Sequence, residues 1–511
     1  MEIELITTGN TYQRPRTDSK TLLRDLKLDP LLAVMAEEDT ELLRICRQML
    51  LQPSTRKKEI MKRQTVLQDG ITHTELFHTI YQSALEALKR IKAFDVNASQ
   101  KYNYVIPVPQ KILSQAEIAF TALEYLEKIR GSIRKEDNFT SEAFSSFCGE
   151  FTAYYTESFI REVRTLLHSL TVLKKTDAIS IGIHLGKGLK MTDLTLHRFL
   201  SDESPAEEKK RVLPFIHKAE GSYEIKIENT TIENKVREMV DASLTWILKT
   251  ISDFNHSAIH LLEQLKFQFG FYCGGINLYK YLSERKINIC FPEFADTQKV
   301  LMTSGLSDLF LVIKDNSATT NSISYKDKHN WIITGVNQGG KTTFLRSIGT
   351  AQLLAQSGYF AAAGQYVCNI YQSIFTHFPE DEDTSLKHGL LEQELLKMQD
   401  IIEGIVPDSL LLLNETFSTT TDYDGAYLAK ELLQGIGESG ITCFYVTHNY
   451  EFSHSLYLEG RAENVFLRAD READGRRSFR LSEGGPVKTG YALDLYTEVM
   501  HDTSHKYSQI I

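Results

Sequence analysis

Apolar residues recur at helical spacing through most of residues 22–290, where prolines are few. Side chains at this spacing share one face of a helix, so the pattern predicts packed helices. One tract covers 109–133, and another runs from 232 to about 282 with apolar positions close to a heptad rhythm. Such a rhythm usually marks a core stripe within one chain. We therefore predict an all-α region over residues 21–295, preceded by an N-terminal extension over 1–20.

Two changes of pattern divide the chain further. Ile179, Ile181 and Ile183 alternate with smaller or polar residues, which is typical of a strand and predicts a small β element near 178–230. Towards the C-terminus, short apolar strands alternate with helical patterns, the order typical of an α/β domain, which we place at 296–511. The predicted fold class is therefore mixed: an all-α region with a small β insertion, followed by an α/β domain.

The composition is that of a globular protein without a membrane segment. The 511 residues are 42% apolar, and no apolar run approaches the roughly 18 residues of a membrane span. The N-terminus lacks the basic start and apolar core of a signal peptide. Six scattered cysteines without Cys-x-x-Cys spacing favour a reducing, cytoplasmic location over a zinc site or a disulfide framework. The net charge of −10 argues against a general nucleic-acid coat protein but leaves room for a local basic surface.

The strongest motif begins at Gly335 and fits the phosphate-binding pattern Gly-x4-Gly-Lys-[Ser/Thr]. The apolar run 331–333 predicts a buried strand before it, and 342–348 predicts an amphipathic helix after it. Backbone N–H groups and the helix N-terminus favour a polyphosphate, the lysine neutralises its charge, and the hydroxyl can bind Mg²⁺. A plain glycine-rich turn is the alternative, which the register of Lys341 and Thr342 disfavours. The predicted phosphate-binding residues are Gly335, Val336, Asn337, Gln338, Gly339, Gly340, Lys341, Thr342 and Thr343.

A second apolar strand, 409–413, ends in Asn414 and Glu415. The carboxyl end of a central parallel strand is where an α/β sheet meets its nucleotide, so we predict that Glu415 orients and deprotonates the attacking water. Asn414 is predicted to help Thr342 hold Mg²⁺. Because an amide brings no negative charge to the metal, Mg²⁺ affinity and turnover are both expected to be reduced. The alternative for Glu415 is an exposed acid at a helix start.

A third apolar strand, 441–447, ends in His448, which could contact the γ-phosphate or the attacking water. A lone histidine is more often structural, but its position directly after a strand favours a part in the reaction. The phosphate loop, the carboxylate strand and the histidine strand follow one another in the order of an ABC-class ATPase.

The residues around these elements also resemble the MutS ATPases of DNA mismatch repair. Asn337 inside the phosphate loop, and the run 423–425 (Tyr-Asp-Gly) after Glu415, distinguish that family from other ABC ATPases. Weaker similarity reaches upstream through 56–69, and in all it covers about residues 20–500.

The resemblance implies a MutS-like helical core and lever domain over 21–295 and a MutS-type ABC ATPase domain over 296–511. It also implies ATP and Mg²⁺ as cofactors, DNA as a partner, and a homodimer whose ATP sites lie at a shared interface. The family's signature loop corresponds to residues 387–394, where Gly389 replaces a serine and is expected to face the partner subunit's phosphates in trans.

The sequence departs from a full mismatch-repair MutS in one further way. It begins almost directly with the helical core, so we expect a short form without the mismatch-recognition and connector domains. The only Phe-x-Glu sequence considered for a mismatch wedge, 291–293, falls in a connector. Branched or recombining DNA is therefore a plausible target.

Two functions follow from these expectations. The first is a MutS-like ATPase that clamps mismatched, branched or recombining DNA under ATP control, in DNA repair or recombination control. The alternative is a nucleotide-gated protein-interaction module that binds ATP with little hydrolysis. Asn414 and Gly389, which replace residues that the family uses for hydrolysis, favour this alternative. Basic clusters at 56–58 and 62–63, and another that includes Arg477 and Arg480, are candidate DNA contacts, although clusters of this size are usually solvated faces.

Overall fold

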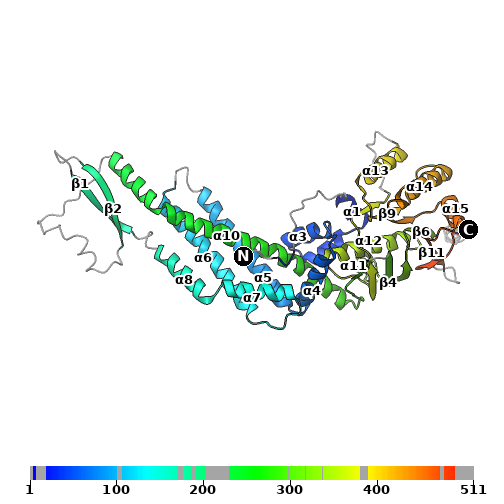
Figure 1. Cartoon of the computed structure of the whole chain (residues 1–511), viewed down its shortest axis with the longest axis horizontal. Coiled ribbons are helices and arrows are strands. Elements are labelled where there is room, and N and C mark those ends of the chain that lie inside the picture. The colour runs from blue at the N-terminus through cyan, green and yellow to red at the C-terminus, as the bar shows by residue number, and fades with distance from the viewer. Residues whose placement is uncertain are drawn as a thin grey trace, which may run out of the picture. The chain divides into compact units, whose positions relative to one another are not determined.

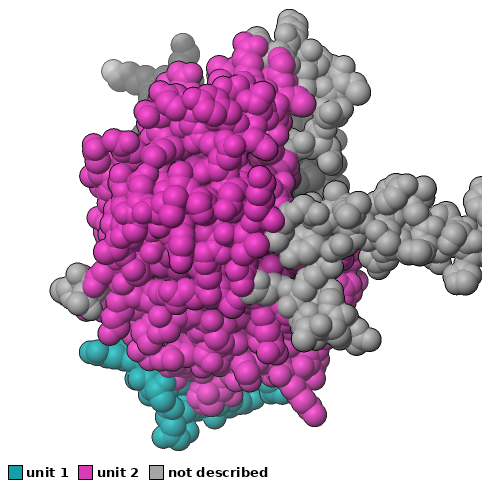
Figure 2. All heavy atoms as spheres, turned by 90° about the vertical axis from the view of Figure 1, so that its right-hand side faces the viewer, with its two compact units in different colours: residues 1–4, 75–269 teal, residues 5–74, 270–511 magenta. Residues whose placement is uncertain are grey.

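The computed structural model shows a helix-rich chain that divides into two compact units (Figure 1). It describes residues 4–6, 19–100, 106–170, 176–185, 191–201, 230–296, 299–316, 318–336, 338–379, 389–471 and 477–488. Unit 1 comprises Met1–Glu4 and Glu75–Phe269, and unit 2 comprises Leu5–Thr74 and Gly270–Ile511. Figure 2 distinguishes the two units by colour.

Unit 1 is built mainly from long helices. They are α5 (Thr74–Gln100), α6 (Val108–Ile133), α7 (Glu142–Tyr154), α8 (Glu157–Ser169) and the first part of α10 (Thr230–Glu284). Side-chain caps fix two of the helix starts: Ser141 accepts a hydrogen bond from the N–H of Phe144, and Thr156 accepts one from the N–H of Phe159. These caps satisfy N–H groups that have no partner within the helix.

The helices of unit 1 pack through two apolar clusters. Phenylalanines from α5, α7 and α10 contact one another, with Phe77 and Phe144 ring centroids 4.7 Å apart. A second cluster joins α6, α8 and α10 through buried aliphatic residues that include Ile112, Leu123 and Leu244. Beside it, the Asn255 side chain donates to the backbone carbonyl of Gln115. These are the core stripes predicted for the two helical tracts.

The predicted small β element begins with an antiparallel hairpin. Strand β1 (Thr176–Leu185) pairs with β2 (Met191–Ser201). Residues 186–190 and 202–229 of the predicted element lie outside the described residues.

Unit 2 carries the remaining helices and two sheets. Its other helices are α1 (Ser19–Asp25), α2 (Asp29–Ala36), α3 (Thr40–Leu50), α4 (Lys57–Thr72), α11 (Leu309–Asp315), α12 (Lys341–Ser357), α13 (Leu390–Gly404), α14 (Asp422–Gly437) and α15 (Tyr450–Glu459). The strands are β3 (Glu293–Phe294), β4 (Val300–Leu306), β5 (Asn321–Lys326), β6 (Asn330–Gly335), β7 (Gln365–Cys368), β8 (Ile374–His377), β9 (Leu410–Asn414), β10 (Thr442–Val446), β11 (Asn464–Arg471) and β12 (Arg477–Glu483).

The larger sheet positions the candidate site. Its strand order is β12-β11-β6-β10-β9-β8, and every pair is parallel except β11 with β12. Strands β6, β9 and β10 are buried along nearly their whole length, which explains their continuous apolar runs. Helix α12 contacts β6, β9 and β10. A separate apolar cluster packs α13, α14 and α15 against alternate residues of the same strands, such as Leu411, Leu413 and Tyr445. The smaller sheet has the order β3-β7-β4-β5.

Buried hydrogen bonds fasten the C-terminal end of α12. The Gln356 amide donates to the backbone carbonyls of Ser54 and Tyr371, and the Ser357 hydroxyl donates to the carbonyl of Met49. Arg63 of α4 donates to the Ser357 carbonyl and is itself only 5% exposed. Buried polar groups of this kind are costly to leave unpaired, so the network fixes α12 against the helices that precede it in the chain.

The helix-rich architecture with mixed sheets agrees with the predicted fold class at that level of detail. The compact units divide the chain within α5 and α10, whereas the sequence-based division fell at 295/296. The assignment of functional domains therefore stays a prediction. Within the described part of the chain, no helix is long and apolar enough to cross a membrane.

A glycine in α10 gives a test of this packing. A Cβ on Gly275 would lie 2.6 Å from Cε1 of Tyr359, whose buried ring stacks on Phe271. We expect Gly275→Ala to lower the free energy of unfolding by about 1–3 kcal/mol, although alanine normally favours a helix. Gly435→Ala in α14, where nothing lies within 4 Å of the new Cβ, is the matched control and should raise it by up to about 1 kcal/mol. Chemical denaturation of both variants measures the difference, and equal stabilities would contradict the packing described here.

Candidate nucleotide-binding site

The predicted phosphate loop joins the end of β6 to the start of α12. Gly335 and Gly340 adopt φ angles of 114° and 93°, which side chains with a Cβ rarely take. A Cβ on Gly335 would also lie 2.5 Å from the carbonyl oxygen of Ala469 on the neighbouring strand β11. The loop conformation therefore requires glycine at these positions. Asn337, also predicted to bind phosphate, lies outside the described residues.

Lys341 is the first residue of α12 and is only 4% exposed. Its ammonium donates to the backbone carbonyls of Gly335 and Val336, over 3.1 and 2.9 Å. Burial lowers the pKa of Lys341 to about 8, and the nearby charge of Glu415 partly opposes that effect. A buried cation whose partners are mostly neutral carbonyls is better stabilised by an anion.

The other loop residues surround this lysine. Val336 is buried, and the N–H of Gly339 donates to its carbonyl over 3.1 Å. The Gln338 side chain accepts a hydrogen bond of 2.8 Å from the guanidinium of Arg477, which belongs to β12. Thr343 follows on α12 and is partly buried. Arg477 thus approaches the loop from a strand that comes much later in the chain.

The two predicted Mg²⁺ ligands lie together. The Thr342 hydroxyl donates to the side-chain oxygen of Asn414 over 2.9 Å, so the helix start and the end of β9 meet. Both side chains present oxygen atoms, the ligand type that Mg²⁺ prefers, and the pair carries no charge. The described part of the chain contains no group of three or more His, Cys, Asp or Glu side chains placed to hold a metal ion. These residues fit Mg²⁺ when phosphate and water complete its shell.

Glu415 and His448 also meet at the ends of adjacent strands. Val446 of β10 pairs with Asn414 of β9, and the N–H of Glu415 donates to the Val446 carbonyl. The Nε2 atom of His448 lies 2.9 Å from Oε1 of Glu415. The hydrogen bond from His448 lowers the pKa of Glu415, burial opposes the shift, and the charges of His448 and Lys341 reinforce it. Glu415 is therefore an ionised carboxylate at neutral pH.

The turn that carries Glu415 has an unusual backbone. Glu415 and Phe417 both adopt left-handed conformations, with φ angles of 53° and 62°. Left-handed conformations of non-glycine residues cost about 1–3 kcal/mol each and persist only where the surroundings impose them. After the turn, Thr421 caps α14 by accepting a hydrogen bond from the N–H of Asp424.

Gly389, the predicted trans contact, lies at the N-cap position of α13. A Cβ added there would have no neighbouring atom of the described residues within 4 Å. The preceding residues of the predicted signature loop, 387 and 388, lie outside the described residues. A role in a partner's site stays a prediction.

Sequence reasoning missed several residues that surround the site. Arg477 was considered only as part of a basic cluster. His377 ends β8 beside β9, and its Nδ1 atom lies 2.9 Å from the hydroxyl of Thr416, the residue after Glu415. A polar residue at the end of an apolar strand was the available signal for His377. No signal in the sequence indicated that β12 returns to the phosphate loop.

The basic cluster at 56–58 and 62–63, a candidate DNA contact, is not the fully solvated face that was expected. Arg63 is buried and hydrogen-bonded to Ser357, and Lys57 pairs with Asp296 over 2.7 Å. The expectation of a solvated face is therefore wrong for Arg63, because its guanidinium serves the contact with α12.

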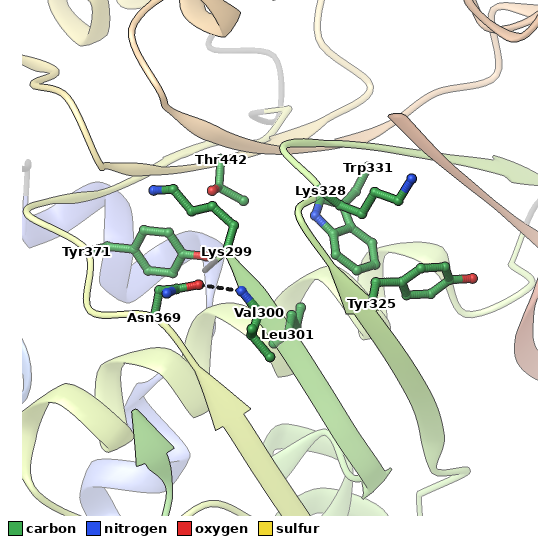
Figure 3. Close-up of a pocket in the computed structure, with 9 residues that line it drawn as sticks. All are labelled: Lys299, Val300, Leu301, Tyr325, Lys328, Trp331, Asn369, Tyr371 and Thr442. Atoms are coloured by element: carbon green, nitrogen blue, oxygen red, sulfur yellow. Dashed lines mark hydrogen bonds between the residues drawn. The ribbon is translucent and has the colours of Figure 1, made fainter. Parts of the chain in front are cut away.

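A small pocket in unit 2 lies away from these residues (Figure 3). It includes Trp331 near the start of β6 and Thr442 at the start of β10, whereas the phosphate loop and His448 follow the opposite ends of those strands. The ammonium of Lys299 binds Asp408, and that of Lys328 binds the carbonyl of Ala462. This pocket is therefore not the candidate nucleotide site.

Two family models match the chain. The model for the MutS2 N-terminal domain matches residues 55–285, and the model for MutS domain V matches residues 331–495. The second match contains the phosphate loop, Asn414, Glu415 and His448.

Curated relatives agree with these matches. The chain is 26% identical over 286 residues to the DNA mismatch repair protein MutS of Bacillus licheniformis, covering 53% of this chain and 33% of that protein. It is 29% identical over 184 residues to the MutS of Shouchella clausii, covering 35% and 21%. It is 28% identical over 166 residues to the endonuclease MutS2 of Clostridioides difficile, covering 32% and 21%. The matches span at most a third of these relatives' own lengths, and together with the two family models they show that the chain belongs to the MutS family.

Proposed function

We propose that the protein is an ABC-class ATPase that converts ATP and water to ADP and phosphate. The observation that carries the proposal is the meeting of Lys341, the Thr342–Asn414 pair and the Glu415–His448 pair at the ends of neighbouring parallel strands. A site of this kind offers a cation for phosphate, oxygen ligands for a metal and a base for water. Membership in the MutS family supports the same activity.

The roles of the residues follow from their positions. Lys341 would exchange its two carbonyl partners for phosphate oxygens, which offer full negative charge. Glu415 would accept a proton from the attacking water. The water oxygen then bonds to the γ-phosphorus, and the bond between that phosphorus and the bridging oxygen breaks, so that this oxygen leaves with ADP. His448, bonded to Glu415, would hold the carboxylate in place and present its imidazole towards the γ-phosphate. Thr342 and Asn414 would hold Mg²⁺, which neutralises charge on the phosphate oxygens.

We further propose that the ATPase controls DNA binding as a dimeric clamp in DNA repair or recombination. The names of the relatives, DNA mismatch repair protein MutS and endonuclease MutS2, support a DNA substrate. Gly389 is exposed at the N-cap of α13, and no atom of the described residues lies within 4 Å of a Cβ placed there, which supports a contact with a partner subunit at that end of the helix. ATP binding would then shift the balance between open and closed dimers.

The alternative is a nucleotide-gated module that binds ATP with little hydrolysis. The neutral Thr342–Asn414 pair favours it, because an amide holds Mg²⁺ less strongly than a carboxylate does. The rate of turnover separates the two functions.

Substitution of the two charged groups tests the proposal directly. We expect Glu415→Gln to lower kcat by about 100-fold or more while ATP still binds, because the base is lost and the shape is kept. Lys341→Ala should instead abolish ATP binding. Turnover is measured with duplex, mismatched and four-way-junction DNA and without DNA. Lys488→Gln, a change on the surface, is the control. Turnover unaffected by Glu415→Gln would contradict the proposed base, and ATP binding without turnover or a DNA response in the wild type would favour the module.

Restoring a carboxylate at Asn414 tests the metal site. Asn414→Asp places a negative charge beside the Thr342 hydroxyl, and we expect the Mg²⁺ concentration for half-maximal turnover to fall by about tenfold. Asn414→Ala should raise that concentration. An Mg²⁺ requirement that is equal in all three proteins would show that residue 414 does not serve the metal.

The burial of Lys341 predicts how nucleotide binding depends on pH. Because its pKa is about 8 in the free protein, the ammonium that attracts phosphate is lost as pH rises above 8. We expect the Kd for an ATP analogue to be constant near pH 7 and to weaken by about tenfold at pH 9. Calorimetric titration between pH 6.5 and 9.5 measures this, with Lys341→Arg as a control that keeps its charge. A Kd that is unchanged at pH 9 would contradict the assigned role of the lysine.

A further inference from the structure

The turn between β9 and α14 is held by side chains from three other elements, β8, β10 and α13. On one side, Nδ1 of His377 lies 2.9 Å from the Thr416 hydroxyl. The Tyr445 hydroxyl of β10 donates to the Thr416 carbonyl over 2.6 Å. His377, Thr416 and Tyr445 are all at most 5% exposed. Both neighbours of Thr416, Glu415 and Phe417, have left-handed backbones.

The third contact comes from α13. The Thr419 hydroxyl donates to the Glu394 carboxylate over 2.6 Å. Burial raises the pKa of Glu394, and hydrogen bonds from the Thr419 hydroxyl and from the backbone of the turn oppose that rise. Glu394 thus binds the second half of the turn, and His377 binds the first half.

The chemistry of His377 suits a fixed support. Burial lowers the pKa of His377 to about 4, with the charges of Lys397 and Arg24 adding to the shift. The imidazole is therefore neutral at physiological pH. A neutral ring that bonds Thr416 adds no charge beside the Glu415 carboxylate.

We infer that His377 and Glu394 are positioning residues that hold the Glu415–Thr419 turn, with Glu415 and Phe417 in left-handed backbones, so that the Glu415 carboxylate faces His448 and the phosphate loop. The inference rests on the proposed ATPase activity and deepens it. Neither side chain contacts the reacting groups. Each acts through the backbone of the turn, because an unsupported turn of non-glycine residues relaxes towards right-handed or extended conformations.

A double-mutant cycle isolates the first support. His377→Leu and Thr416→Val each remove one partner of the same hydrogen bond with little change of volume. We expect kcat to fall roughly tenfold or more in each single variant, KM for ATP to stay within about twofold, and the double variant to be no slower than the singles. His377→Asn, which keeps a hydrogen-bonding atom close to the place of Nδ1, should recover most of the lost rate.

The second support has its own matched pair. Thr419→Val removes the hydroxyl that donates to Glu394, and we expect the same pattern of lowered kcat with little change in KM. Glu403→Gln is the control on the same helix, because Glu403 lies near the far end of α13 and accepts its hydrogen bond from Gln399, within that helix. Its rate should equal that of the wild type.

Hydrogen exchange of the peptide that covers residues 410–421 gives a readout without hydrolysis. We expect this peptide to exchange faster in His377→Leu and Thr419→Val than in the wild type, whereas exchange in the rest of the larger sheet should stay the same. Normal kcat in His377→Leu, additive losses in the double variant, or rate losses that only follow a lower Tm would overturn the inference. If the wild type hydrolyses no ATP, the proposed function fails, and the positioning role is then judged from hydrogen exchange alone. Exchange of residues 410–421 that is the same in the variants and in the wild type would overturn it.

Discussion

The register of three parallel strands is the constraint on which the site depends. Strand β10 pairs with β6 on one side and with β9 on the other, so the carboxyl ends of all three reach one edge of the sheet. The phosphate loop follows β6, Glu415 follows β9 and His448 follows β10. A shift of one residue in any pair would turn the buried side chains of that strand to the other face and separate the charged groups. The apolar cores on both faces of the sheet therefore specify the geometry of the site.

The phosphate-loop helix connects this edge to the rest of unit 2. The N-terminal end of α12 carries Lys341 and Thr342, and its C-terminal end is tied by Gln356 and Ser357 to helices from the start of the chain. Nearly every residue of α12 is buried, so the helix has no solvated face along which it could slide. The turn that follows β9 is fixed in a different way: the Thr416 and Thr419 hydroxyls bond side chains of β8 and α13, and the Thr416 carbonyl accepts a hydrogen bond from β10. One part of the site thus depends on packing and the other on polar contacts.

The sequence predicts the parts of the site that follow from local patterns, but it does not predict contacts between residues that are distant in the chain. The phosphate loop and the three apolar strands were readable because each is a local pattern of residue types, and the helical tracts of α6 and α10 were readable from their periodicity. The contact between Arg477 and Gln338 was not, because it joins residues that are distant in the chain through a strand that has no motif. The burial of the Arg63 guanidinium against α12 has no local signal either, because a basic residue next to lysines usually lies on a solvated face. The compact units also depend on long-range contacts, which no local pattern contains.

A crystal structure of the Glu415→Gln variant with ATP and Mg²⁺ would test the proposed site most directly. We expect the Lys341 ammonium to leave the carbonyls of Gly335 and Val336 for phosphate oxygens. We also expect Thr342 and Asn414 to turn towards the metal, and the amide introduced at position 415 to lie beside the γ-phosphate with His448. ATP bound elsewhere, or Lys341 still on its two carbonyls with nucleotide present, would contradict the claim that these strand ends form an ATPase site.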